Sequence, residues 1–259
     1  MSLKGKFPFS IGATSYTLAD KVVPNVEFLS SLVDDIEIVL FESDKTCPLP
    51  LEGDVEKIAE VKRSSGLSFT IHLPLDLQLG HQDKGIRKQS IEQCKRIFQR
   101  MEPLQPFGYV FHCNRELGLQ PDFNVHWLDR TSESLGALID FGVEPEKICL
   151  ETLDYSYTLL TPLIERYHVR YCLDIGHVIR YGFNPSQAIA DILTCSRIVH
   201  IHGVKGKRDH ADLRHFDAGV MKLLIEKLVD HQINERVVTL EVFSTDDLQG
   251  SLTVMEKYL

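Results

Sequence analysis

The stretch Tyr171-Cys172-Leu173-Asp174-Ile175-Gly176-His177 has the pattern of a short buried strand that ends in a carboxylate. Its apolar residues run without a break, which is typical of parallel strands covered on both faces. The same pattern, an apolar run that ends at or near Asp, Glu or His, recurs along the chain. The other residues in this position are His72, His112, Glu151, His200 and Glu241.

Runs of this kind alternate with amphipathic segments. Eight strands are expected, at 10–14, 36–41, 68–72, 108–112, 148–151, 171–174, 198–202 and 237–242. Helices are expected at 54–64 and 86–101, from Pro24, after the N-cap of Asn184-Pro185, and after Asp217. Eight βα units without a linker predict a (β/α)8 TIM barrel, an α/β fold, as a single domain over residues 1–259.

The alternative fold is an open, doubly wound α/β sheet. Such a sheet needs a glycine-rich turn of the form GxGxxG after its first strand to hold a phosphate. The segment Ile11-Gly12-Ala13-Thr14 does not supply that turn, so the sequence favours the closed barrel.

The composition is that of a globular, acidic protein. Hydrophobic residues make up 43% and charged residues 25%, and the net charge of −9 disfavours nucleic acid or an anionic membrane as main partner. No apolar run approaches the roughly 18 residues of a membrane span, and we recognise no export signal. The six cysteines lack paired spacing. We therefore expect reduced thiols, with Cys113, Cys149 and Cys172 buried, and a cytoplasmic protein.

The polar strand ends predict a metal site. Asp, Glu and His make up about one residue in five, so their occurrence at six successive strand ends is not expected by chance. In a barrel these ends converge on one mouth, where carboxylates and imidazoles would stay unpaired without a cation. A set of carboxylates and imidazoles without thiolates suits Zn, Mn or Fe(II) better than Ca.

Other polar residues near the mouth keep more than one interpretation. His202 shares a strand face with His200, so either is a candidate ligand. After the seventh strand, further ligands are offered by Asp209-His210 or, alternatively, by Asp212 and His215, unless this is only a solvated loop. The candidates for contact with a substrate are Lys207, Arg208, Glu42 and His202. Four histidines receive no role: His81, His126, His168 and His231.

At these strand ends the sequence resembles the xylose-isomerase-like TIM barrel superfamily, which includes the endonuclease IV family and many sugar isomerases and epimerases. The likeness covers nearly the whole chain and implies a metal held by Glu151, Asp174, His200 and Glu241. Likeness to the endonuclease IV branch implies further ligands at His72, His112 and His177, with an Asp–His pair after strand seven. One residue separates that pair in the branch, whereas Asp209 and His210 are adjacent here.

A narrower likeness is to the cobamide-remodelling phosphodiesterases. The stretches that carry it are 12–16, 34–37, 40–43, 72–76, 79–81, 200–204 and 208–210. This resemblance implies hydrolysis of the phosphodiester in the nucleotide loop of cobamides such as adenosylcobalamin. That reaction releases the lower ligand and leaves a cobinamide phosphate.

The leading hypothesis is a metal-dependent phosphodiesterase with two or three divalent cations. Two cations would clamp the attacking and leaving oxygens at phosphorus, and Glu151 would be shared between them. Glu151 and Glu241 are the catalytic candidates. His177 with Asp209 or His210 would hold a third cation or bind the phosphate.

The alternative is a metal-dependent sugar (phosphate) isomerase or epimerase. It needs only one ion, with Glu151 and Glu241 as acid–base groups, and the additional histidines therefore favour hydrolysis. An abasic-site DNA endonuclease is less favoured because of the acidic net charge, and a binding module without enzymatic activity is least favoured. The expected partner is a small phosphodiester or sugar substrate, with a cobamide as the leading candidate and no membrane.

Overall fold

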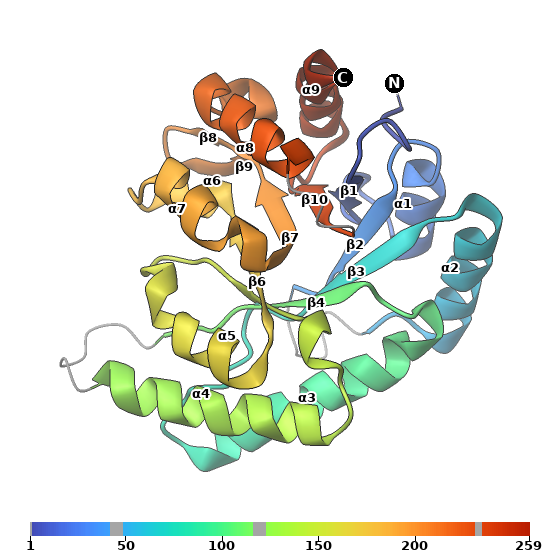
Figure 1. Cartoon of the computed structure of the whole chain (residues 1–259). Coiled ribbons are helices and arrows are strands. Elements are labelled where there is room, and N and C mark those ends of the chain that lie inside the picture. The colour runs from blue at the N-terminus through green and yellow to red at the C-terminus, as the bar shows by residue number, and fades with distance from the viewer. Residues whose placement is uncertain (1, 42–48, 116–122, 231–234) are drawn as a thin grey trace.

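The computed structural model describes every residue except 1, 42–48, 116–122 and 231–234. Eight parallel strands close into a barrel in the order β1-β10-β7-β6-β5-β4-β3-β2, surrounded by helices (Figure 1). The barrel strands are β1 (Ser10–Thr14), β2 (Asp35–Val39), β3 (Ser68–His72), β4 (Gly108–Phe111), β5 (Ile148–Glu151), β6 (Arg170–Asp174), β7 (Ser196–Ile201) and β10 (Val237–Leu240). The expected (β/α)8 barrel is confirmed, and strand ends differ from expectation by one or two residues.

The helices form the outer layer of the barrel. They are α1 (Val22–Leu29), α2 (Glu52–Ser65), α3 (Lys84–Met101), α4 (Phe123–Asp140), α5 (Thr161–Tyr167), α6 (Ile175–Arg180), α7 (Pro185–Ile192), α8 (Ala218–Asp230) and α9 (Thr245–Met255). The expected caps are confirmed, because Asn184 accepts the N–H of Gln187 and Asp217 that of Val220. Helix α1 begins at Val22 rather than Pro24, since the whole first turn tolerates a residue without an N–H.

An apolar layer closes the barrel below its polar strand ends. Four buried side chains from adjacent strands pack together there, namely Val110, Cys149, Cys172 and Ile198. Each lies two residues before a predicted ligand, and the period of two in a strand places both on the same, inward face. The polar residues therefore form a second inward layer above an apolar floor, at the mouth of the barrel.

The segment after β7 differs from the expected polar loop. Strands β8 (Gly203–Lys205) and β9 (Arg208–Ala211) form an antiparallel hairpin. It turns at Gly206, whose φ of 63° is the left-handed conformation that glycine adopts without strain. The hairpin fixes the position of Asp209 and His210, which a flexible loop would not do.

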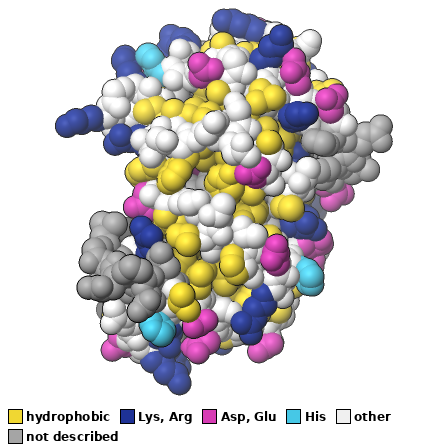
Figure 2. Space-filling view, turned by 60° about the vertical axis from the view of Figure 1, so that its left-hand side comes forward, with side chains coloured by type: hydrophobic (Ala, Val, Ile, Leu, Met, Phe, Trp, Pro, Cys, Tyr) yellow, Lys and Arg dark blue, Asp and Glu magenta, His cyan; other side chains and the backbone are white. Residues whose placement is uncertain are grey.

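The surface carries both signs of charge. On the face in Figure 2, acidic and basic side chains are interspersed around a band of hydrophobic ones. Cys113, Cys149 and Cys172 are buried, as expected. In the part of the chain that the structure describes, no helix is both long and apolar enough to cross a membrane.

Candidate metal centre

The barrel strand ends, α6 and the hairpin bring ten side chains that could bind a metal together at the barrel mouth, in three groups that each place their ligand atoms within 4.8 Å of one another. The first group is His72, His112 and Glu151; the second is Glu151, Asp174, His200 and Glu241; the third is His177, His202, Asp209 and His210. Glu151 belongs to two groups because it ends β5, which lies between the strands that supply the others.

The first group places two imidazoles on one carboxylate oxygen. Glu151 Oε2 lies 3.2 Å from His72 Nε2 and 2.7 Å from His112 Nε2. His72 Nδ1 donates to the backbone carbonyl of Leu73 at 2.9 Å, which fixes the orientation of the ring. His72 and Glu151 are buried, whereas the His112 side chain is 15% exposed. The first group is therefore open to solvent on the side of His112.

The second group gathers three carboxylates around one imidazole. His200 Nδ1 lies 3.4 Å from Glu151 Oε1, 3.4 Å from Glu241 Oε2 and 3.9 Å from Asp174 Oδ2. All four side chains are buried. Three buried carboxylates so close together repel one another unless a positive charge lies among them.

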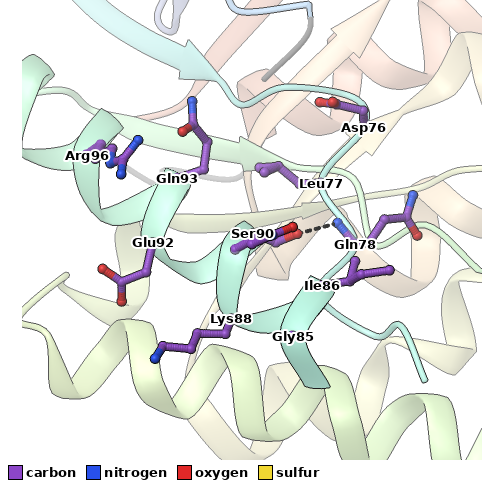
Figure 3. A pocket seen from close by; sticks show the side chains of 11 residues that line it. Asp76, Leu77, Gln78, Gly85, Ile86, Lys88, Ser90, Glu92, Gln93 and Arg96 are labelled. Atoms are coloured by element: carbon purple, nitrogen blue, oxygen red, sulfur yellow. Dashed lines mark hydrogen bonds between the residues drawn. The ribbon is translucent and has the colours of Figure 1, made fainter. Parts of the chain in front are cut away.

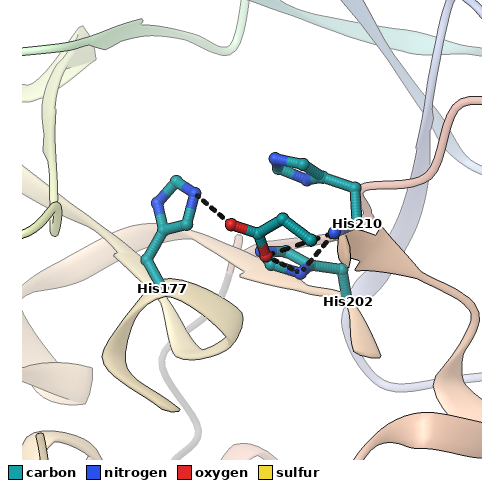
Figure 4. Close-up of side chains that lie close together, drawn as sticks. His177, His202 and His210 are labelled. Carbon is teal, nitrogen blue, oxygen red and sulfur yellow. Dashed lines mark hydrogen bonds and ion pairs between the residues drawn. The ribbon is translucent and has the colours of Figure 1, made fainter. Parts of the chain in front are cut away.

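The third group joins α6 to the hairpin (Figure 4). Asp174 caps α6 by accepting the N–H of His177 at 2.7 Å. The His177 ring then lies with Nδ1 3.3 Å from Asp174 Oδ2 and Nε2 3.9 Å from Asp209 Oδ2. His202 Nδ1 lies 3.2 Å from Asp209 Oδ1, and the rings of His202 and His210 are 4.2 Å apart.

The ligand atoms of these groups fit a bound cation. Several are buried and have no hydrogen-bond partner among the described residues: Glu151 Oε1, Asp174 Oδ2, His200 Nδ1, His202 Nε2, His210 Nδ1 and Glu241 Oε2. Buried polar atoms are normally paired, and each unpaired one costs about 1–3 kcal/mol. Lone pairs of oxygen and imidazole nitrogen that converge without partners are what a divalent cation of the Zn, Mn or Fe class requires.

Gly176 has no side chain, which leaves room for the His202 imidazole of the third group. A Cβ at this position would lie 2.2 Å from His202 Cε1, so alanine would displace the imidazole. We expect Gly176→Ala to lower the free energy of unfolding by about 1–3 kcal/mol, as overpacking does. In a His202→Ala background the same change should be neutral or stabilising by up to about 1 kcal/mol, because alanine favours a helix. Urea denaturation of metal-free protein measures both, and equal effects in the two backgrounds would contradict the prediction.

Protons on the histidines replace a cation in the metal-free protein. Burial lowers the pKa of His72, but the hydrogen bond and charge of Glu151 outweigh it and raise the pKa to about 9. Burial also lowers the pKa of His210, but the charge and hydrogen bond of Glu241 outweigh this effect and raise the pKa to about 9. Burial would raise the pKa of Glu151, but His112, His200 and His72 hold it well below its usual range.

The stability of the metal-free protein should therefore fall as pH rises above neutral. Folding raises the pKa of His72 and His210 from 6.5 to about 9, so the folded state binds their protons more tightly. The resulting stabilisation is complete below pH 6.5 and is lost as pH rises toward 9. We expect the Tm to decline over this window, and a saturating divalent cation to remove the decline. A Tm of the metal-free protein that is flat or rising over this window would contradict the raised pKa values of His72 and His210.

Of the predicted substrate contacts that the structure describes, Lys207 and Arg208 lie outside the three groups. His202 belongs to the third group rather than to a separate substrate contact. Arg208 pairs with Asp247 of α9, and Lys207 is exposed in the turn of the hairpin. Glu42 lies outside the described residues. Roles for Lys207, Arg208 and Glu42 in binding substrate therefore stay predictions.

The structure separates the two alternative pairs after strand seven. Asp209 and His210 face the mouth, whereas Asp212 accepts from the Arg214 side chain at 2.7 Å and His215 is exposed. The positions of Asp209 and His210 follow from the β8–β9 register, which shifts between Gly203 and Lys205. This register is not visible in the periodicity of the segment.

One pocket of the described chain has a lining separate from the mouth cluster (Figure 3). It has a volume of about 670 Å³ and is lined by α3 and by the segment before it, where Ser90 Oγ accepts the N–H of Gln78. None of the ten clustered side chains lines it. The residues of the candidate site and those of this pocket therefore do not overlap.

One buried acid beside the site stands inside a predicted strand, and the sequence pattern assigns it no role. Glu37 lies within β2, and its Oε2 is 2.8 Å from His200 Nε2. The available signal was Glu37 as the one charged residue of the predicted strand 36–41, because a buried charge is rare unless it has a partner.

The fold and the three groups define a (β/α)8 barrel with a histidine and carboxylate cluster at the mouth. A family model described as xylose isomerase-like TIM barrel matches residues 28–258. The chain therefore belongs to the xylose isomerase-like TIM barrel family.

Solved structures show the same fold at low sequence identity. A D-tagatose 3-epimerase-like protein is 18% identical, with a TM-score of 0.74 over 96% of each chain. Endonuclease IV from Thermus thermophilus is also 18% identical, with a TM-score of 0.74 over 96% of this chain and 98% of that one. D-psicose 3-epimerase from Clostridium cellulolyticum is 14% identical, with a TM-score of 0.71 over 96% and 98%. A comparison with curated proteins finds no match.

Proposed function

We propose that this protein is a metal-dependent phosphodiesterase. The observation that carries the proposal is the sharing of Glu151 between two ligand groups, with two histidines on one oxygen and the second group on the other. His72, His112 and Glu151 would hold one cation; Glu151, Asp174, His200 and Glu241 would hold the second. A pair of cations bridged by a carboxylate is the arrangement that suits displacement at phosphorus.

The cations would supply charge neutralisation at the phosphoryl oxygens and activation of water at neutral pH. The side chains at the mouth determine how a substrate reaches them. His112, Asp209 and His210 are 15%, 24% and 26% exposed, while the other ligands are buried deeper. A phosphodiester would therefore enter between the first and third groups.

We propose that His177 and His210 act on that phosphodiester. His177 Nδ1 lies 3.5 Å from Glu151 Oε1, and its Nε2 faces Asp209, so this ring connects the second and third groups. His210 Nδ1 lies 3.4 Å from Glu241 Oε2. In the absence of a third cation, these imidazoles offer N–H donors to phosphate oxygens. If a third cation binds, it would be held by the third group, through His177, His202, Asp209 and His210.

An aromatic row beside the mouth supports a substrate with a large apolar part. The ring of Phe243 lies 5.1 Å from His210 and 5.7 Å from Phe41, which in turn lies 4.6 Å from Tyr16. The three aromatic residues are partly exposed and follow neighbouring strands. We propose a cobamide as the substrate, because its nucleotide loop joins a phosphodiester to an aromatic base that such a row would bind. We also propose that the protein acts in the cytoplasm.

A second candidate function is a metal-dependent sugar isomerase or epimerase. The specific observation is that the second group alone offers one imidazole and three carboxylates, enough to hold a single cation. Glu151 and Glu241 would then exchange a proton next to a carbonyl group. This function leaves His72 and His112 without a role.

Metal analysis followed by substrate assays tests the proposal. We expect two or three tightly bound cations per chain, and hydrolysis of adenosylcobalamin and of bis-p-nitrophenyl phosphate with Zn, Mn or Fe(II). One bound cation and turnover of a ketose would establish the epimerase instead. Absence of phosphodiester cleavage with all three metals would refute the phosphodiesterase, and cleavage of abasic DNA in preference to the cobamide would refute the substrate.

A further inference from the structure

Glu37 is a charged residue in the middle of a fully buried strand. It lies in β2, with an exposed fraction of 0%, in register with Thr14 of β1 and Thr70 of β3. It belongs to none of the three ligand groups. Residues two apart share a strand face, so Asp35 lies on the same side of β2 as Glu37. The β2 strand thus carries two buried acids that the metal-ligand assignment does not use.

Glu37 reaches across the barrel interior to one nitrogen of His200. Glu37 Oε2 lies 2.8 Å from His200 Nε2, although 163 residues separate them in the chain. A carboxylate only accepts hydrogen bonds, so this contact requires the ring proton on Nε2. The Cys172 thiol also contacts His200, but burial raises its pKa well above the ordinary value, so it is a neutral and weaker partner.

The other nitrogen of His200 faces the second ligand group. Nδ1 is directed at Glu151, Asp174 and Glu241, and it has no hydrogen-bond partner in the described part of the chain. A neutral imidazole with its proton on Nε2 presents a lone pair at Nδ1. The contact with Glu37 therefore selects the form of His200 that binds a cation.

A purely structural role explains Glu37 poorly. Its Oε1 is buried without a hydrogen-bond partner among the described residues, and removing a carboxylate from water costs several kcal/mol. An apolar side chain at this position would avoid that cost. A buried charge that lowers stability but contacts a metal-binding side chain is expected where that contact positions the side chain.

We propose that Glu37 is a positioning residue, which holds the Nε2–H form of His200 and directs Nδ1 to a cation shared with Glu151, Asp174 and Glu241. This inference rests on the cation site of the proposed function. A carboxylate behind a ligating histidine fixes the ring and makes it a stronger ligand, and its loss weakens metal binding by about 10–100-fold.

The test is Glu37→Gln in the full-length protein, titrated with Zn²⁺ against a chromogenic chelator. We expect one equivalent to bind about 10–100-fold more weakly. We also expect the metal-free variant to have an equal or higher Tm, because a buried charge is removed. A structural role would have the opposite signature, namely a lower Tm of the metal-free protein and unchanged affinity.

Asp35→Asn is the matched control. Asp35 is equally buried on the same strand, but it accepts from Ser68 and Thr70, each at 2.6 Å, and belongs to none of the ligand groups. Its replacement should leave Zn²⁺ affinity unchanged. If Glu37→Gln does not fold, Glu37→Asp keeps the charge but falls one methylene short of His200, and the same loss is expected.

The two proposals fail in different ways. Zn²⁺ binding that is unchanged in Glu37→Gln, with normal binding in the unaltered protein, overturns the positioning role and leaves the phosphodiesterase intact. An unaltered protein that binds no Zn²⁺ overturns both the cation site and this inference.

Discussion

Glu151→Gln is expected to abolish phosphodiester hydrolysis, lowering kcat/KM by more than about a thousandfold, or about 4 kcal/mol of barrier. Glu151 Oε2 faces His112 at 2.7 Å and Oε1 faces His200 at 3.4 Å, so one change alters both groups. An amide is neutral, and its NH₂ donates where a ligand must accept. We expect both bridged cations to be lost or bound weakly, as metal analysis of the purified variant would show.

The fold should survive this change, because the amide has nearly the same volume as the acid. Far-ultraviolet circular dichroism and gel filtration check that expectation. The matched control is Glu133→Gln on α4, where the side chain is 71% exposed and pairs with Arg87 rather than with a mouth residue. Near-normal hydrolysis in Glu151→Gln would rule out the shared role of Glu151.

The double variant His72→Ala/His112→Ala should separate the two candidate functions. It removes the first group and leaves the second, so the expected metal content falls by one equivalent per chain. We expect hydrolysis to fall by at least about a hundredfold, or about 2.7 kcal/mol. An epimerase that needs only the second group would retain most of its turnover. Plasma mass spectrometry and assays on both substrate classes give the two measurements.

His126→Ala/His215→Ala is the control for this double variant. Both histidines are exposed, so their loss should change neither metal content nor hydrolysis. An effect of the control equal to that of His72→Ala/His112→Ala would show that histidine number, and not position, determines metal binding. Full hydrolysis after removal of the first group would refute the mechanism with two cations.

The barrel and the convergence of its polar strand ends were predictable from local patterns. Each strand is a continuous apolar run, and its last polar residue is visible without knowledge of its neighbours. Closure of a parallel barrel then requires the strand ends to converge, so Glu151, Asp174 and Glu241 had to meet. The structure brings them together with His200, the same four residues that the resemblance to the superfamily implied.

The third group was only partly predictable. His202 was one of two candidates on a strand face, and the structure brings both histidines to the mouth in different groups. Their rings diverge because His200 is held by Glu37 while His202 packs against Gly176 and His210. Of these three neighbours, Glu37 and Gly176 are far in sequence from the segment that carries the two histidines. Only His210, in the hairpin, follows it closely.

By itself, the sequence determined the barrel, its polar mouth and most of the candidate ligands, because strand period, chain closure and residue type are local or topological properties. Only the tertiary structure decided which oxygen faces which nitrogen, that the hairpin presents Asp209 and His210, and that Glu37 lies behind His200. These contacts depend on register and ring orientation across the barrel. Such properties arise when distant segments pack, and no pattern along a single strand encodes them.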